Sequence, residues 1–336
     1  MIKRIGSRTI GFEEMPSIIG YASVVGKKES EGPLGEHFDK IIYDSYNGLD
    51  TYEDAESRMQ AEALTIALQK SGASAEEIDF VFAGDLLNQC ISSSFGVRDF
   101  NIPYLGQYGA CSTMAQGLIM SSVFVESGAA NKAACATSSH FCSAERQYRF
   151  PLEYGGVRTP TAQWTTTAAG SCVLSKAKKG AGIARATVGK IIDLGIKDAN
   201  NRGAAMAPAA AETISAYFSD TQTSPEDYDL ILTGDLGLIG SRALYDLLIA
   251  DGIDISKNHN DCGLMIFDRD KQDVHAGGSG CGCCASVLCS KILKDMESGK
   301  LGNILFIATG ALLSTTTAGQ SKTIPSIAHL VNIKYK

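Results

Sequence analysis

The chain of 336 residues contains 44% hydrophobic and 20% charged residues, which is typical of a soluble globular protein with one large domain or two similar halves. Its formal net charge of -7 argues against nucleic acid as a partner, and its ten cysteines lack the spacing of a secreted disulfide framework, so we expect a reducing compartment. No apolar run reaches the length of a membrane span, and the first residues lack the apolar core of a signal peptide.

The first part of the chain predicts alternating strands and helices. Residues 18–25 form an apolar run bounded by glycines, which indicates a buried strand. Residues 53–70 place apolar side chains near one face at helical spacing. Residues 74–77 (Ser-Ala-Glu-Glu) have the pattern of a capping box, and the apolar residues 78–83 that follow predict a second strand.

A turn around Cys111 is the first candidate functional site. The apolar residues 102–105 lead into residues 109–113 (Gly-Ala-Cys-Ser-Thr), and a helix-like run over 118–125 follows. A thiol at a strand-to-helix turn lies close to unpaired backbone N–H groups, which favour anions and lower the pKa of a thiol. Cys111 is therefore a candidate nucleophile or part of an anion site, and the alternative is a small buried residue that packs a crowded turn.

The chain contains an internal repeat with an offset of 150 residues. Residues 74–86 recur as residues 224–236, and both halves then continue through the order strand, helix, strand, helix, strand. Each half ends in a further predicted strand, near residues 171–175 and near residues 324–333. This duplication predicts an α/β fold with pseudo-twofold symmetry, in which mixed, mostly parallel sheets carry helices on their faces.

The two predicted halves, residues 1–180 and residues 181–336, differ in one long loop. Residues 140–170 lack periodicity, and a loop of this length inside a compact domain is usually functional. Its arginines and its tryptophan are Arg146, Arg149, Arg158 and Trp164. Arginines interleaved with aromatic residues suit a planar anionic ligand. Alternatively, the loop packs on itself or on a second subunit.

Nine blocks of sequence carry a family resemblance. They are residues 31–35 (EGPLG), 84–89 (GDLLNQ), 108–113 (YGACST), 138–140 (SSH), 151–156 (PLEYGG), 160–165 (PTAQWT), 203–211 (GAAMAPAAA), 261–266 (DCGLMI) and 308–314 (ATGALLS). In this order, and covering nearly the whole chain, they resemble the stage V sporulation protein AD family, which lies within the thiolase and ketoacyl-synthase superfamily.

This resemblance implies a thiolase-like five-layer αβαβα fold built from two duplicated halves. It also implies a role in sporulation, in the spore or forespore, for a protein that is peripheral to the inner membrane and associated with the membrane subunits of a channel complex from the same type of operon. The channel moves dipicolinic acid, usually as its calcium chelate, and the family is expected to bind dipicolinic acid directly. Members of the superfamily commonly form homodimers through the strand before the nucleophile turn, here residues 103–109.

An enzyme remains the alternative. Thiolases and condensing enzymes pair the cysteine with a histidine and a second histidine or asparagine from the second half. The corresponding turns here are residues 234–238 (Gly-Asp-Leu-Gly-Leu) and 279–283 (Ser-Gly-Cys-Gly-Cys), without either residue type. His140, at the end of the adjacent strand, is a candidate partner of Cys111, although it could equally be a structural histidine. We therefore rank ligand binding above acyl-CoA-dependent acyl transfer or condensation with Cys111 as nucleophile.

Two helices are predicted to start at the centre of the molecule, and we expect dipicolinate to use one of these helix starts, or one helix start plus an arginine of the long loop. Calcium would belong to the ligand, with Asp85 and Asn88 as oxygen donors, although Asp85 is repeated as Asp235 and has a structural alternative. The predicted ligand-binding residues are Asp85, Asn88, Cys111, Ser112, Thr113, Ser138, Ser139, Arg146, Arg149, Trp164, Ser279 and Cys281. No resident cofactor or metal site is expected, because the cysteines at 281, 283, 284 and 289 lie on one turn and helix without a second pair at metal-binding spacing.

Overall fold

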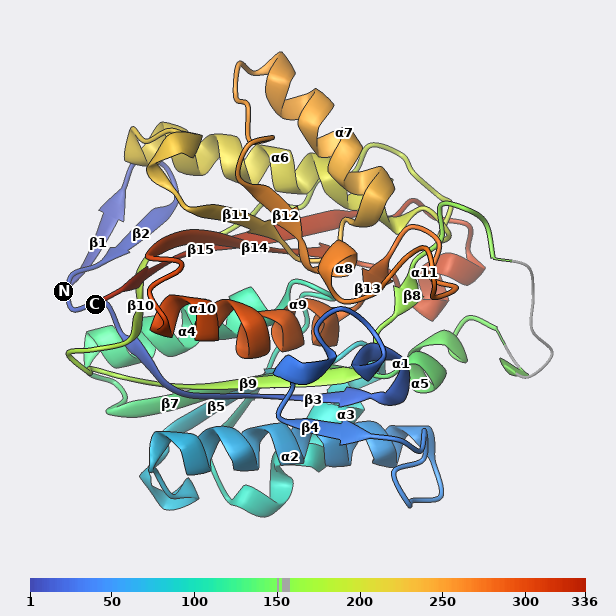
Figure 1. The fold of residues 1–336 in the computed structure, drawn as a ribbon, viewed down its shortest axis with the longest axis horizontal. Coiled ribbons are helices and arrows are strands. Elements are labelled where there is room, and N and C mark those ends of the chain that lie inside the picture. Colours follow the sequence, from blue (N-terminus) through green and yellow to red (C-terminus); the bar gives the residue numbers. More distant parts are fainter. Residues whose placement is uncertain (150, 153–157) are drawn as a thin grey trace.

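The computed structural model describes residues 1–149, 151–152 and 158–336, so residues 150 and 153–157 of the predicted long loop lie outside the described residues. Figure 1 shows five layers, in which two sheets enclose a middle layer of helices and each sheet carries further helices on its outer face. The helices are α6 (Arg202–Thr221) and α7 (Gly237–Ala250) on one outside, α4 (Thr113–Ser127), α9 (Cys281–Val287) and α10 (Leu293–Glu297) in the middle, and α2 (Tyr52–Ser71) and α3 (Ile91–Val97) on the other outside. The predicted five-layer α/β architecture is confirmed.

The two sheets repeat one strand arrangement, and they are joined to each other through the antiparallel pairing of Gly182 with Ser17. The first contains β3 (Ser17–Gly26), β4 (Lys40–Ile42), β5 (Phe80–Gly84), β6 (Tyr104–Gly106), β7 (Lys132–Ser139) and β9 (Ala168–Ser175). The second contains β10 (Ala181–Thr187), β11 (Leu230–Thr233), β12 (His259–Asp261), β14 (Asn303–Ala311) and β15 (Ser326–Tyr335). In the first, β5 pairs in parallel with β6 and β7, and β9 is antiparallel between β7 and β3. In the second, β11 pairs in parallel with β12 and β14, and β15 is antiparallel between β14 and β10.

The offset of 150 residues that is seen in the sequence is also present in the structure. Helices α2 and α6 each span 20 residues and begin 150 residues apart. Both predicted repeats contain the capping box, at Ser74 with Glu77 and at Ser224 with Asp227, and a strand follows each. The predicted boundary between residues 180 and 181 coincides with the start of β10. The division of the chain into two separate units at this point stays a prediction.

Short elements complete the chain. They are β1 (Ile2–Ile5), β2 (Thr9–Phe12), α1 (Lys27–Ser30), α5 (Phe141–Glu145), β8 (Trp164–Thr165), α8 (Cys262–Met265), β13 (Gly278–Ser279), the π-helical turn Leu288–Ile292 and α11 (Thr315–Gly319). None of the helices in the described part of the chain is both long and apolar enough to cross a bilayer.

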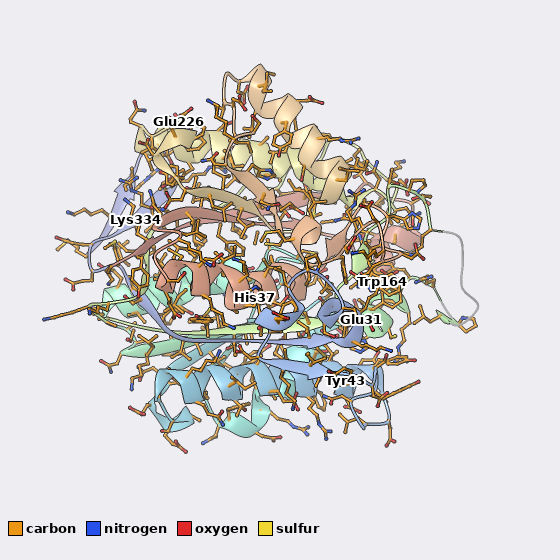
Figure 2. The ribbon with its side chains drawn as sticks, in the orientation of Figure 1. Glu31, His37, Tyr43, Trp164, Glu226 and Lys334 are labelled. Atoms are coloured by element: carbon orange, nitrogen blue, oxygen red, sulfur yellow. The ribbon has the colours of Figure 1, made fainter. Side chains whose placement is uncertain are left out.

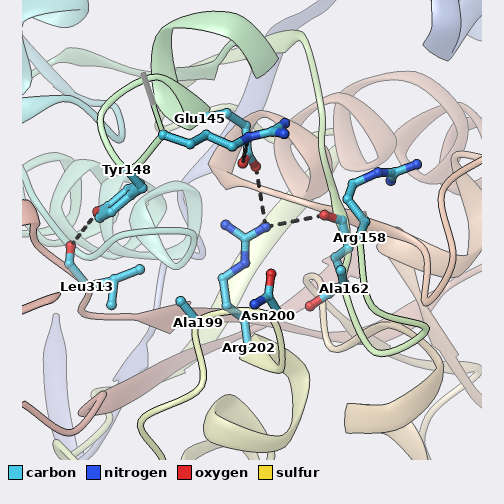
Figure 3. Close-up of a pocket in the computed structure, with 10 residues that line it drawn as sticks. Glu145, Tyr148, Arg158, Ala162, Ala199, Asn200, Arg202 and Leu313 are labelled. Atoms are coloured by element: carbon cyan, nitrogen blue, oxygen red, sulfur yellow. Dashed lines mark hydrogen bonds and ion pairs between the residues drawn. The ribbon is translucent and has the colours of Figure 1, made fainter. Parts of the chain in front are cut away.

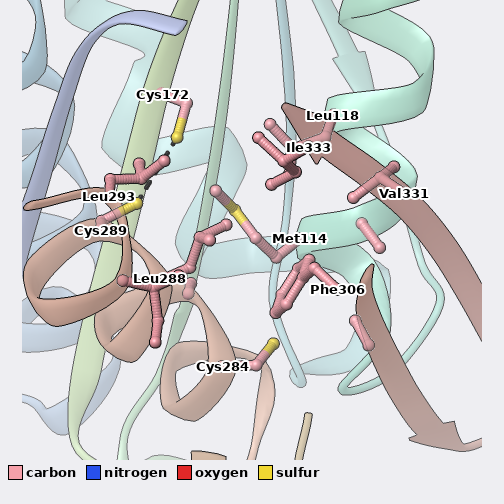
Figure 4. Close-up of a cluster of buried hydrophobic side chains, with 14 of the residues drawn as sticks. Met114, Leu118, Cys172, Cys284, Leu288, Cys289, Leu293, Phe306, Val331 and Ile333 are labelled. Atoms are coloured by element: carbon pink, nitrogen blue, oxygen red, sulfur yellow. Dashed lines mark hydrogen bonds between the residues drawn. The ribbon is translucent and has the colours of Figure 1, made fainter. Parts of the chain in front are cut away.

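The main core lies between the two sheets, around the helices of the middle layer. Figure 4 shows Met114 and Leu118 of α4 packed with Phe306 of β14 and with the helix that carries Cys284. Because both faces of this layer are covered by a sheet, its helices are apolar on more than one side. The ten cysteines are free thiols, and Cys281, Cys283, Cys284 and Cys289 are fully buried, where they pack as small apolar side chains.

The carboxyl of Glu29 in α1 makes stability depend on pH. Glu29 is fully buried and accepts a hydrogen bond from the backbone N–H of Thr167 at 3.0 Å, and burial raises its pKa from 4.5 to about 7. Between these pH values the folded protein holds a proton that the unfolded chain has released, so stability falls as the pH rises, by about 3 kcal/mol in all. Urea unfolding at pH 5 and pH 8.5 should show a loss of stability with rising pH that is about 3 kcal/mol smaller in Glu29→Gln than in the wild type, because other buried carboxyls contribute to the loss in both proteins, and parallel pH profiles would contradict it.

Candidate functional site

The turn that carries Cys111 is buried between the two halves. Ala110 has φ of +49°, a left-handed conformation that residues other than glycine rarely adopt. Gly310 of β14 packs against this turn so closely that a Cβ atom on it would lie 2.3 Å from the carbonyl oxygen of Gly109. Cys111 is only 5% exposed and lies two residues before the start of α4. The predicted strand-to-helix position of Cys111 is therefore correct.

The thiol of Cys111 faces Asp235, which follows β11 in the second half. Burial raises the pKa of Cys111 well above its ordinary value, and the charge of Asp235, to which the thiol donates a hydrogen bond, raises it further. Asp235 lies in the turn that corresponds, by the superfamily resemblance, to the position of a catalytic histidine. This environment keeps Cys111 in its neutral form, which is the poorly nucleophilic form of a thiol.

The carboxylate of Asp235 also fills the helix start that we predicted as an anion site. It accepts hydrogen bonds from the backbone N–H of Gly280 at 2.9 Å, the hydroxyl of Ser279 at 2.8 Å and the hydroxyl of Thr309 at 2.7 Å. The thiol of Cys281 donates to the backbone carbonyl of Ser138 at 2.9 Å. The protein's own groups thus occupy the donors of Ser279 and Cys281, which the sequence predicts as ligand contacts.

The first-half residues at the equivalent position are also engaged within the protein. Asp85 accepts hydrogen bonds from the backbone N–H groups of Leu87 and Ser93, at 2.8 and 2.7 Å, and from the hydroxyl of Ser93 at 2.7 Å. These bonds favour the structural interpretation of Asp85, and its neighbour Asn88 is exposed in the following turn. The hydroxyl of Ser138 donates to Glu56 at 3.0 Å and that of Ser139 to the carbonyl of Thr166 at 2.7 Å.

His140 is held away from Cys111 by its own hydrogen bonds. Its Nδ1 atom accepts from the backbone N–H of Cys142 at 3.1 Å, and its Nε2 atom lies 2.9 Å from the carbonyl oxygen of Ser45. Its ring stacks on Tyr52 with 5.7 Å between centroids, and burial lowers its pKa to about 4. Both ring nitrogens have partners other than the thiol, so the structural alternative fits His140 better than the catalytic one.

A cavity of about 310 Å³ lies beside the Cys111 turn (Figure 3). Its lining residues are Glu145, Tyr148, Arg149, Arg158, Ala162, Gln163, Ala199, Asn200, Arg202 and Leu313. Three arginines and one glutamate give these side chains a formal charge of +2. A positively charged cavity of this size fits a small anionic ligand.

The three arginines of the cavity keep part of their hydrogen-bonding capacity free. Arg202 lies 3.8 Å from Glu145 and donates a long hydrogen bond of 3.4 Å to the carbonyl of Gln163. The Nε atom of Arg149 lies 3.4 Å from the other oxygen of Glu145. Arg158 is paired with Asp273, whose carboxylate lies 2.6 Å away outside the cavity lining. Because the three side chains are between 16 and 32% exposed, water screens their charges only in part.

A second, inner cavity of about 40 Å³ reaches Cys111. It shares Glu145, Tyr148, Arg202 and Leu313 with the larger cavity. The hydroxyls of Tyr108 and Tyr148 both donate to the backbone carbonyl of Leu313, at 3.0 and 3.3 Å, and Figure 3 shows the second of these bonds. A space of this volume holds about one water molecule. The thiol is therefore at the bottom of a narrow passage, and the room for a ligand lies outside it.

The other predicted ligand residues contact other groups. Arg146 forms two hydrogen bonds with Glu53, at 2.8 and 2.5 Å, and is absent from the described lining of both cavities. The hydroxyls of Ser112 and Thr113 donate within their own turn. Trp164, at the end of the molecule away from the chain termini (Figures 1 and 2), stacks on Phe141 with 3.9 Å between ring centroids.

Trp164 contacts Arg158, one of the residues that line the larger cavity. The guanidinium of Arg158 lies 4.8 Å from the centre of the Trp164 ring, a cation–π contact that helps to fix this arginine at the cavity wall. Of the predicted ligand residues, the structure thus places Arg149 in the larger cavity and Cys111 in the inner one. It adds Glu145, Asn200 and Arg202, which sequence analysis missed.

Comparison with known proteins identifies relatives along almost the whole chain. Residues 6–334 match the family described as Stage V sporulation protein AD (SpoVAD). The stage V sporulation protein AD of Bacillus subtilis (strain 168) is 44% identical over 328 residues, which cover 98% of this chain and 97% of that protein.

Solved structures at low sequence identity share the fold. One is 3-oxoacyl-(acyl-carrier-protein) synthase III from Aquifex aeolicus, with a TM-score of 0.59 and 14% identity over 95% of this chain and 100% of that chain. Another is a variant of Xanthomonas campestris OleA, with a TM-score of 0.60 and 13% identity over 99% of this chain and 100% of that chain. These similarities confirm the predicted thiolase-like fold.

Proposed function

The chain belongs to the stage V sporulation protein AD family, and from this premise we propose that it binds dipicolinate, pyridine-2,6-dicarboxylate, free or as its calcium chelate, in the cavity of about 310 Å³. The observation that carries the proposal is the convergence of Arg149, Arg158 and Arg202 on this cavity. Guanidinium groups bind carboxylates through two parallel hydrogen bonds, so several of them suit a ligand with two carboxylates.

The rest of the lining suits the planar ring of such a ligand. Tyr148 and Leu313 offer an aromatic and an aliphatic surface on one side, and Asn200 offers an amide group on another part of the wall. Small-molecule sites commonly combine apolar walls with a few polar groups that fix the orientation. Calcium, where present, is part of the ligand in this proposal and not a resident cofactor.

Titration calorimetry of the full chain with dipicolinate tests the proposal. We expect one ligand per chain, and we expect benzoate, which has a single carboxylate, to bind at least about tenfold more weakly because it loses a charge-assisted pair with an arginine. Dipicolinate that gives no heat, or that binds no better than benzoate, would contradict the proposed site.

The wider role that we propose is uptake of dipicolinic acid into the developing spore as part of a membrane channel complex. In this role the protein lies in the forespore, peripheral to the inner membrane, and contacts channel subunits from the same type of operon. Family membership supports this role. Co-purification of the tagged chain with membrane subunits from sporulating cells is the expected result, and recovery of the chain without them would contradict it.

We also propose a homodimer that forms along the edge of the first sheet. Strand β6 ends the strand order and pairs only with β5 among the described strands, so its other edge is free to pair with a second copy. Leu105 on β6 is 44% exposed, and Phe95 of the neighbouring helix α3 is 47% exposed. Apolar side chains beside an open edge are typical of a surface that another chain covers.

Leu105→Arg should therefore convert the dimer into a monomer, because it places a charge in the centre of the proposed interface. Light scattering coupled to size-exclusion chromatography measures the change in mass. Leu247→Arg on α7 is the matched control, since Leu247 is also partly exposed, at 37%, but belongs to the outer layer of the second half. A wild type that is monomeric at high concentration would contradict the proposal.

Acyl transfer at Cys111, the alternative from the sequence, has less support. The inner cavity is too small for an acyl-pantetheine arm, and Asp235 and burial hold the pKa of the thiol high. Incubation with acyl-coenzyme A followed by mass spectrometry of Cys111 separates the two functions, since a covalent adduct would favour the enzyme.

A further inference from the structure

We propose that Glu145 is a specificity-determining residue that tunes the larger cavity toward the cation-bound form of its dicarboxylate ligand and against the free dianion. This inference rests on the proposed function, because it concerns the form in which the same ligand binds. It arises from the one carboxylate among the described residues that line this otherwise basic cavity.

Glu145 is held in a fixed place on the wall between the two cavities. It ends helix α5, lines both cavities, and its Oε1 atom accepts a hydrogen bond from the hydroxyl of Thr165 at 2.7 Å. Its side chain is only 20% exposed. A carboxylate that is anchored and partly buried in this way cannot turn into solvent when an anion enters the cavity.

Glu145 also pairs with two of the arginine side chains that a ligand carboxylate would contact. One of its oxygens lies 3.4 Å from the Nε atom of Arg149. The other lies 3.8 Å from the Nη2 atom of Arg202, as Figure 3 shows. Asp273 neutralises Arg158 in the same manner from outside the lining. A free dianion therefore competes with Glu145 for the two arginines and approaches a fixed negative charge as it does so.

A bound divalent cation removes most of this penalty. In the chelate, the cation cancels the two negative charges of the ligand, while the outer carboxylate oxygens still accept hydrogen bonds from arginine. A hard cation such as calcium takes six to eight oxygen ligands, so a chelating dicarboxylate leaves positions that a carboxylate or its bound water can fill. Glu145 is thus repulsive toward the free dianion and neutral or attractive toward the chelate.

Calorimetry with the full chain tests this inference, using dipicolinate with excess calcium chloride and dipicolinate with a chelator that removes calcium. For Glu145→Gln, which keeps an acceptor for Thr165, the ratio of the Kd of the free dianion to the Kd of the chelate should fall at least about tenfold relative to the wild type. Glu53→Gln is the matched control, because Glu53 also pairs with an arginine, Arg146, but outside the cavity, and its ratio should stay unchanged.

Each outcome has a defined meaning. An unchanged ratio in Glu145→Gln, or an equal weakening of both forms, would show that Glu145 merely positions the arginines, and would overturn this inference while leaving the proposed function intact. A wild type that binds neither form would overturn both. Glu145→Met, which also lacks the charge, and the melting temperatures of all variants guard against a result that comes from misfolding, because both variants must shift the ratio in the same direction.

Discussion

Replacing Arg202 with alanine should weaken the binding of dipicolinate by about 30-fold or more. Arg202 lies in the wall that the two cavities share, and among the described residues its guanidinium has Glu145 and the carbonyl of Gln163 as its ion-pair and hydrogen-bond partners, over distances of 3.8 and 3.4 Å. A charge-assisted pair with a ligand carboxylate contributes about 2 kcal/mol, which corresponds to about 30-fold in affinity. Titration calorimetry measures the loss. The affinity of Arg202→Lys should lie between those of the wild type and Arg202→Ala, because lysine keeps the charge but loses the planar fork of the guanidinium.

Arg146→Ala is the matched control for this prediction. Arg146 comes from the same long loop as Arg149 and is predicted from the sequence as a ligand residue, yet its guanidinium is bound to Glu53 by two hydrogen bonds. Its removal should change the affinity for dipicolinate less than about twofold. Equal losses in Arg202→Ala and Arg146→Ala would contradict the assignment of the ligand to this cavity and favour the predicted site on the long loop.

The elements of the fold could be predicted because their signals are local and occur twice. The helix predicted over residues 53–70 is α2 (Tyr52–Ser71), and the strand predicted over 18–25 is β3 (Ser17–Gly26). The strand predicted over 78–83 begins later, at Phe80, because Ile78 still closes the preceding 3-10 turn. Because the sequence repeats at an offset of 150 residues, the elements of the first half also predict those of the second half.

The ligand cavity could not be predicted in the same way because three distant segments form it. Its wall combines residues within 145–149 and 158–163 of the first half, residues 199–202 before and at the start of α6, and Leu313 after β14. At the repeat position of Arg202 the first half has Tyr52, so the duplication itself gives no hint of a charged group there. A contact made only by the packing of the halves leaves no pattern along the chain.

At the start of α9, where the sequence predicts an anion site, the carboxylate of Asp235 accepts the hydrogen bonds of the donors. Sequence analysis identified the helix start near Cys281 and Ser279 as a ligand residue there, and it identified Asp235 as the repeat of Asp85. It could not show that Asp235 lies against these donors and accepts their hydrogen bonds. An anion site that an internal carboxylate already fills looks the same in a sequence as one that is open to a ligand.

Of the substitutions proposed here, Asp235→Ala should reduce stability the most, with a loss of about 4 kcal/mol in the free energy of unfolding. The substitution leaves the buried donors of Ser279, Gly280 and Thr309, as well as the Cys111 thiol, without their acceptor, and each unsatisfied buried group costs about 1–3 kcal/mol. Since a domain is stable by only about 5–15 kcal/mol, urea unfolding should show a clear shift of the midpoint.

Asp235→Asn separates the hydrogen bonds of this carboxylate from its charge. Asparagine keeps one acceptor oxygen, so its loss of stability should be smaller than that of alanine. The amide no longer carries the charge that raises the pKa of Cys111, so iodoacetamide should alkylate this thiol faster in the variant than in the wild type. Because Asp235 joins α9, β14 and the Cys111 turn of the other half, an alanine variant as stable as the wild type would mean that this junction contributes little to holding the two halves together.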